Sequence, residues 1–195
     1  MANSTFGAEY ALFAPFAAPE VEDAAPTYVE PFSLGGFVSI TETPNVSTGQ
    51  LYSDNKETLR RDAISSYTLA LVTDGIDNER SSDLYGSAYD EATGEVGRDT
   101  DDKPPLGGYG YIRNIGTEDG DFYKGMFYPK AKAAPTADGA NTQGQSVTYG
   151  TTSATLTALK AKHKLTKLRA ESKNFETREE AVAWLDGKFG YAPAP

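Results

Sequence analysis

Hydrophobic and polar residues alternate with a period of two in several segments, and this pattern predicts β-strands. The alternating apolar residues are Phe32, Leu34, Val38 and Ile40 in the first segment, and Tyr67, Leu69 and Leu71 in the second. Gly35 and Gly36 interrupt the first segment, which indicates a bulge or a close backbone contact. We therefore expect a mainly β fold whose first strand lies within residues 32–41.

Two aromatic-rich segments, 109–115 and 122–128, flank a polar turn at residues 116–121. They predict a β-hairpin with a loop longer than two residues. In the second segment Phe122, Met126 and Tyr128 fall on one face, and Tyr123 and Phe127 on the other. A strand with two apolar faces is buried on both. We expect it to lie inside the fold or against a partner subunit.

Residues 146–159 predict a further long strand. Val147 and Tyr149 share one phase, whereas Ala154, Leu156 and Ala158 take the other. The slip falls at Gly150, which indicates a bulge.

Two short helices are expected. The first runs from about Asp77 to Leu84 and closes at Gly86. The second begins at a capping box in which Thr177 is followed three residues later by Glu180. Gly187 is expected to end it. Trp184, the single tryptophan, is expected to pack this helix on the sheet with Phe175 and Phe189.

The remaining segments predict long connections within one domain, 1–195. Residues 1–31 are expected to form an N-terminal arm, and residues 42–65, 90–108 and 129–146 to form long loops. Loops longer than 12–15 residues are uncommon in a compact domain unless they are functional. We expect these three to pack on other subunits.

Charge divides the chain into two halves. Residues 1–102 carry 19 Asp and Glu against 5 Lys and Arg, whereas residues 103–195 carry 9 against 13. A net charge of −10 argues against a general nucleic-acid binder. The division suits head-to-tail self-association, although an acidic surface with one basic element explains it equally well.

Composition narrows the classes further. The absence of cysteine excludes disulfides, thiol chemistry and zinc sites built on cysteine. The N-terminus lacks the features of a signal peptide, and no apolar run approaches the length of a membrane span. We expect a soluble protein made in a cytoplasm, with no cofactor, metal or membrane partner.

Three blocks carry a resemblance to a known family. They are TPNVSTGQLYSDNKE at 43–57, the GYGYIRNIG…DGDFYKGMFYPKAKAAP hairpin, and GQSVTYGTTSATLTAL running on to FETREEAVAWLDGKF. In their order and spacing they resemble the phage major tail proteins of the phi13 and TP901-1 type. The blocks span residues 43–189, whereas residues 1–31 have no counterpart.

The resemblance implies a structural subunit of the tail tube of a long-tailed bacteriophage. The implied fold is a β-sandwich with long loops, whose inner strands form one continuous barrel in a ring of six. Implied partners are further copies of the chain, the tape measure protein, and the tail terminator and distal tail proteins. The implied location is the virion. An acidic lumen would let DNA pass without specific binding, because it repels phosphates.

Contacts between subunits are expected from the loops and from the basic stretch 160–169, which could meet the acidic loops of an adjacent ring. The residues expected to make them are Tyr52, Asp54, Lys56, Asp101, Asp102, Lys164 and Lys167. Nucleic acid or lipid is the alternative partner for the basic stretch.

Other functions have weaker support. His163, the single histidine, has no Ser, Asp or Glu motif converging on it, so no catalytic site is expected. Asp99, Asp101 and Asp102 resemble the start of a calcium loop, but Pro104 stands where that loop needs glycine. Residues 108–112 resemble part of an RNA-binding strand without its basic first residue.

Three further alternatives remain open at this point. A tail terminator would share the fold but stop at one ring. Another head–tail joining protein and a β-sandwich carbohydrate-binding module are the others, and the last would require an export signal and a ring of exposed aromatic residues.

Overall fold

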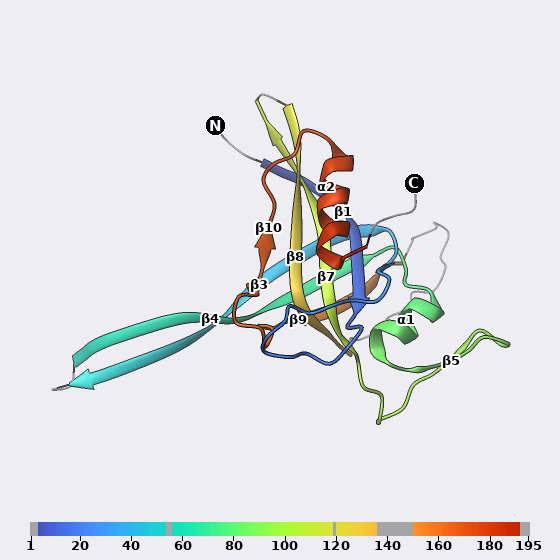
Figure 1. Cartoon of the computed structure of the whole chain (residues 1–195), viewed down its shortest axis with the longest axis horizontal. Helices are drawn as coiled ribbons and strands as arrows, with labels where there is room; N and C mark the ends of the chain where they lie inside the picture. The colour runs from blue at the N-terminus through green and yellow to red at the C-terminus, as the bar shows by residue number, and fades with distance from the viewer. Residues whose placement is uncertain (1–3, 54–55, 119, 136–149, 192–195) are drawn as a thin grey trace, which may run out of the picture.

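The computed structural model describes residues 4–53, 56–118, 120–135 and 150–191 (Figure 1). The chain is mainly β, with two helices in the described residues. In chain order the elements are β1 (Ser4–Pro15), β2 (Phe32–Ser33), β3 (Phe37–Ser53), β4 (Lys56–Thr73), α1 (Asn78–Tyr85), β5 (Ala88–Asp90), β6 (Glu95–Gly97), β7 (Leu106–Thr117), β8 (Gly120–Ala134), β9 (Thr152–Ala158), β10 (Ala170–Glu171) and α2 (Arg178–Phe189).

One antiparallel sheet organises the molecule. Its strand order is β2-β1-β7-β8-β9-β4-β3, with β10 added to β8, and β5 and β6 form a separate small hairpin. Strand β3 contacts β1 although four strands separate them in this order. The backbone N–H of Leu34 donates to Ala11, and that of Asp74 donates to Gly36. The sheet therefore bends until its two ends approach each other.

The concave face of this bent sheet holds the main core. Its largest fully buried side chains come from β1, β4, β7, β8 and β9, and include Phe13, Leu69, Tyr109, Tyr128 and Leu156. Because inward-facing residues of a strand alternate with outward-facing ones, the same strands also present a second face.

Helix α2 covers that second face over β1, β7 and β8 (Figure 1). Ala181, Leu185 and Phe189 pack on Leu12, Ile112 and Phe127. The prediction that 122–128 is buried on both faces is thus confirmed within the fold. Met126 and Tyr128 face the main core, whereas Tyr123 and Phe127 face α2. Trp184 packs there as well, together with Phe175 and Phe189.

The prediction of a loop at 42–65 is wrong. Strands β3 and β4 pair continuously from Phe37 and Thr73 to Ser53 and Lys56. The outer half of this hairpin projects far from the rest of the molecule (Figure 1). Backbone pairing between two long strands outweighs the turn signal that the sequence carries at Thr43-Pro44-Asn45, whereas the signal at residues 53–55 falls where β3 ends and β4 begins.

The prediction that residues 1–31 form an arm is also wrong for its first half, because β1 lies inside the sheet. It pairs with β7 from Ser4 to Pro15, with register shifts between Thr5 and Gly7 and between Glu9 and Leu12. Tyr10 lies in the second shift at φ 56°, a left-handed conformation that is uncommon outside glycine. Residues 16–31 then cross the body, where the Glu20 carboxylate pairs with Lys130 in a mostly buried ion pair.

The remaining predicted elements agree with the structure in part. The 109–115/122–128 hairpin is confirmed as β7 and β8, and α1 ends at Gly86 as predicted. The predicted loop longer than two residues is wrong, because the two strands stay paired as far as Thr117 and Gly120. Val38 lies outside the core at a register shift of β3, although Phe32 and Leu34 are buried. Of the two other predicted loops, 90–108 contains β6 and the start of β7, and 129–146 begins inside β8.

Helix α2 starts where predicted but ends later. The Thr177 hydroxyl accepts from the backbone N–H of Glu180, whereas the left-handed C-cap is Gly190, so Gly187 lies within the helix. In the strand predicted at 146–159, Ala154, Leu156 and Ala158 face the core as β9. Val147 and Tyr149 lie outside the described residues.

Candidate functional site

The projecting hairpin is the most unusual surface of the molecule. We call residues 43–53 of β3 and 56–66 of β4 the arm. Residues 43–50 and 59–65 are all exposed. Exposed apolar side chains gather there: Val46, Leu59 and Ile64 are between 51% and 63% exposed. An isolated two-stranded hairpin is marginally stable in water, so this surface suits contact with another molecule.

One face of the arm continues the core-facing side of the sheet. Val46 pairs directly with Ile64, and the same face carries the pairs Thr48–Asp62 and Gln50–Arg60. The Thr48 hydroxyl donates to Asp62 at 2.7 Å, and Arg60 pairs with the same carboxylate. The opposite face carries Ala63 and Arg61. Each face of the arm therefore carries apolar and charged side chains next to one another.

Two long strand edges have no partner strand among the described residues. One is the outer edge of β3, which ends the sheet. The other is the outer edge of β1 before Ala11, because β2 pairs with β1 only at Leu12 and Phe13. Unpaired strand edges readily pair with another chain.

A polar cluster lies where the arm leaves the body. The Glu42 carboxylate accepts hydrogen bonds from the hydroxyls of Tyr111 and Tyr128, both at 2.7 Å, through Oε1. Its Oε2 accepts from Arg113 at 3.0 Å and from Arg169 at 3.3 Å. The Glu42 side chain is 11% exposed.

The two tyrosines of this cluster stay protonated donors. Burial raises the pKa of the Tyr111 and Tyr128 hydroxyls well above the ordinary value, and the adjacent Glu42 charge raises it further. Arg169 also pairs with Glu171, which Lys124 contacts in turn. The cluster is an alternating ladder of positive and negative groups.

An acidic surface lies across the molecule from the arm, where the β5–β6 hairpin projects to the opposite side (Figure 1). Residues 88–102 contain six Asp and Glu and one Arg. Asp90, Glu91, Glu95, Asp99 and Asp101 are exposed. We call residues 88–102 the acidic lobe.

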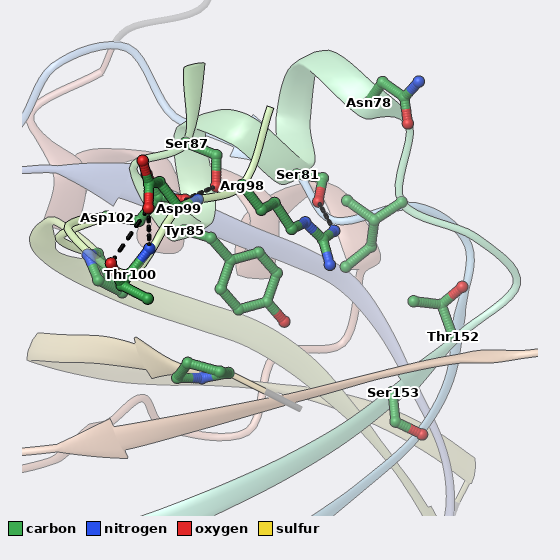
Figure 2. A pocket seen from close by; sticks show the side chains of 13 residues that line it. Asn78, Ser81, Tyr85, Ser87, Arg98, Asp99, Thr100, Asp102, Thr152 and Ser153 are labelled. Atoms are coloured by element: carbon green, nitrogen blue, oxygen red, sulfur yellow. Dashed lines mark hydrogen bonds between the residues drawn. The ribbon is translucent and has the colours of Figure 1, made fainter. Parts of the chain in front are cut away.

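A polar cleft of about 430 Å³ lies between α1, the acidic lobe and the start of β9 (Figure 2). Arg98 lies with its guanidinium 5.6 Å from the Tyr85 ring centre and donates to Ser81. Asp102 accepts from the Ser87 hydroxyl at 2.7 Å and from the backbone N–H of Asp99. These polar groups bond to one another. Among the described residues, neither Ser81 nor Ser87 contacts a histidine that could activate its hydroxyl as a nucleophile.

The basic stretch 160–169 runs over the surface after β9, and we call it the basic segment. Lys160, Lys162, Lys164 and Lys167 are exposed, and Leu165 is 80% exposed. His163 is half-buried and lies 2.9 Å from the Thr166 hydroxyl. Arg169 departs from this pattern, because it turns inward to Glu42.

The structure places the predicted contact residues in three separate regions. Lys164 and Lys167 lie together in the basic segment, and Asp101 and Asp102 lie together in the acidic lobe. Asp102 is half-buried and bonded within its own loop, so Asp101 is the more accessible of the pair. Tyr52 and Lys56 belong to the arm, but their side chains, and Asp54 altogether, lie outside the described residues.

Sequence reasoning missed Glu42 and its partners. Glu42 sits in a segment predicted as a loop, and its partners come from positions 69 or more residues away. The one available signal was an acidic residue at the end of the alternation in 32–41.

The resemblance of residues 108–112 to an RNA-binding strand does not extend to its chemistry. Tyr109 and Tyr111 are fully buried in the core and cannot stack on bases. In the described part of the chain, no three acidic or histidine side chains are grouped to hold a metal ion. No helix among the described residues is long and apolar enough to cross a membrane.

Comparisons with protein-family models, curated proteins and solved structures found no match to this chain.

Proposed function

We propose that this protein is a self-assembling structural subunit of the phage tail-tube type, which stacks in rings around a conduit for DNA. The arm is the observation that carries the proposal. A hairpin exposed on both faces is costly to keep alone in water, and its apolar residues become useful when a neighbouring copy covers them.

Ring closure has its own support in the two unpaired strand edges. Pairing the β3 edge of one copy with the β1 edge of the next would be a heterologous contact. Such contacts close into a ring when the rotation between copies permits, and closure removes every edge. In this proposal the bent sheet is the sandwich of the subunit, and six copies form one continuous inner barrel.

Stacking has support in the distribution of charge. The basic segment and the acidic lobe are separate exposed surfaces of opposite sign. Adjacent rings would bring them together, as in other complementary interfaces. The tape measure protein, the terminator and the distal tail proteins would then be the partners of the finished tube, with no catalytic role for the chain.

The first test is negative-stain electron microscopy of the purified protein, concentrated at near-neutral pH. We expect rings or hollow tubes. In a shortened variant, residues 45–66 are replaced by a two-residue Asn-Gly turn, which connects antiparallel strands well. This variant should keep its near-ultraviolet circular dichroism but form no tubes.

A full-length protein that stays monomeric would contradict self-assembly, and single rings that never stack would favour the tail terminator. Tubes formed by the shortened variant would show that the arm is not the stacking element.

A further inference from the structure

We propose that Glu42 is a positioning residue that fixes the direction in which the arm leaves the body. The biological meaning of this inference rests on the proposed function, because a stacking element must meet its neighbour at a defined angle. The physical claim concerns the single chain and stands on the contacts at the arm root.

Support from the rest of the sheet ends just before the arm. Strand β9 pairs with β4 only from Thr73 to Tyr67, opposite Ala158. Beyond Tyr67 the sheet has two strands. Glu42 pairs in register with Leu69, so it occupies one of the last three-stranded positions.

A bulge lies immediately outward of this point. The register shifts between Asn45 and Val46, where Ser65 is the extra residue of β4. Bulges bend and twist a hairpin. The Asn45 amide donates to Ser66 and Thr68, and the Ser65 hydroxyl donates to the Asn45 carbonyl, so the bulge itself is well bonded. The arm can therefore bend relative to the body mainly in the short segment between the end of the β9 pairing, at Tyr67, and the bulge at Ser65.

Glu42 lies just inward of this segment and anchors β3 to the body from three directions. Its donors come from β7 (Tyr111 and Arg113), from β8 (Tyr128) and from the end of the basic segment (Arg169). Hydrogen bonds to a charged carboxylate are about twice as strong as neutral ones. Four of them on one side chain define its position against the body.

A small rotation at the root of the arm produces a large displacement of its tip. Nine residues of extended chain from Asn45 to Ser53 reach about 30 Å, so a rotation of about 10° at the root moves the tip by about 5 Å. That displacement equals the spacing of neighbouring strands. An unfixed arm would therefore miss a partner surface by one strand.

The experiment uses the natural absence of cysteine. Spin labels at Ser47→Cys in the arm and Ala183→Cys on α2, both exposed positions, report the arm direction by double electron–electron resonance. Labelled protein is diluted with an excess of unlabelled protein, so that distances within one chain dominate even when copies associate.

We expect one narrow distance distribution in the otherwise unchanged chain. Glu42→Gln keeps the shape but removes the charge, and it leaves Arg113 and Arg169 without a counter-ion at that oxygen. Losing a charge-assisted bond should raise the population of other arm directions about tenfold or more, and so broaden the distribution. Arg169→Gln removes a single partner and should broaden it less.

Asp62→Asn is the matched control, because it removes an acid that bonds Thr48 and Arg60 within the arm. Its distribution should match that of the unsubstituted chain. The proposal is overturned if Glu42→Gln or Arg169→Gln, with unchanged near-ultraviolet circular dichroism, gives the same narrow distribution as the control.

The two failures are distinguishable. A protein that never assembles, but whose arm loosens in Glu42→Gln, would refute the tail-tube proposal and leave the role of Glu42 intact.

Discussion

Asp186 shows how a single residue can oppose the fold at neutral pH. It lies in α2 and is 1% exposed. Its Oδ1 accepts from the Tyr10 hydroxyl at 3.2 Å, while Oδ2 has no hydrogen-bond partner. Burial raises the pKa of this carboxyl, and the bond from Tyr10 offsets only part of that rise. A buried carboxylate with one unbonded oxygen costs stability once it is ionised.

This leads to a prediction for Asp186→Asn. The folded protein holds the Asp186 proton to higher pH than the unfolded chain does, so the free energy of unfolding falls as pH rises through that interval. An asparagine at this position does not ionise, so the variant does not lose stability in this way as the pH rises. The stability of the variant relative to the parent should therefore increase as the pH rises from 4 to 7.

Urea unfolding at several pH values would measure the difference. A difference between the two proteins that stays constant over this range would show that Asp186 is not the source of the pH dependence.

At the scale of elements, α2 depends on glycines in the strands beneath it. A Cβ atom on Gly125 of β8 would lie 2.4 Å from the Trp184 ring, and one on Gly110 of β7 would lie 2.4 Å from a Leu185 methyl carbon. Real atoms do not approach so closely. The helix therefore rests directly on strand backbone, and this close approach requires glycine there.

We expect Gly125→Ala to destabilise the protein by about 1–3 kcal/mol, because the added methyl group overpacks the contact with Trp184. Gly187→Ala is the matched control. A Cβ at Gly187 would meet nothing within 4 Å, and the residue lies inside the helix, where alanine is more stable than glycine by up to about 1 kcal/mol. Thermal unfolding should give shifts of opposite sign. A neutral Gly125→Ala would contradict the close packing.

The elements also show which parts of the fold could be predicted from sequence. Strong local signals succeeded: the aromatic alternation of β7 and β8, and the Thr177–Glu180 cap of α2. Strand β1 was missed because Ala and Pro surround it, and because the left-handed Tyr10 breaks its alternation. Gly187 was misread as a helix end since nothing local distinguishes it from Gly190, which adopts the left-handed cap.

The candidate site was harder to predict for a physical reason. Alternation of apolar and polar residues indicates a strand with one buried and one exposed face. The arm is exposed on both faces at residues 43–50 and 59–65. Its sequence therefore has the polar composition of a loop. Glu42 matters through Tyr111, Tyr128 and Arg169, which only the bent sheet brings together. In contrast, the exposure of Lys164 and Lys167 follows from a run of lysines that no core could accommodate.

At the scale of the whole molecule, exposed charges of opposite sign lie on separate surfaces. The acidic lobe and the arm project to opposite sides (Figure 1), and the basic segment supplies exposed positive charge elsewhere on the surface. In a stacked assembly every copy uses both signs at once. If the proposed rings form, the attraction between them would be repeated around the ring, although each exposed pair alone contributes little.

The final prediction tests this complementarity with Lys164→Glu combined with Lys167→Glu. Both lysines are exposed, so the change should leave the fold intact but replace attraction by repulsion at the acidic lobe. Tubes should fail to form at physiological salt. The control, Lys173→Glu with Lys188→Glu, changes the net charge equally at exposed positions next to Phe175 and Trp184, and should still assemble.

A compensating variant identifies the partner surface. Glu91→Lys with Asp101→Lys, added to the reversed lysines, exchanges the two signs and should restore tubes as judged by electron microscopy. Restoration should weaken as salt rises, because screening shortens the reach of exposed charges to about 8 Å at physiological ionic strength. If the lysine variant assembles normally at that salt, electrostatic stacking is wrong. If the fourfold variant stays unassembled, the basic segment meets a surface other than Glu91 and Asp101, and the proposed pairing of the basic segment with the acidic lobe is wrong.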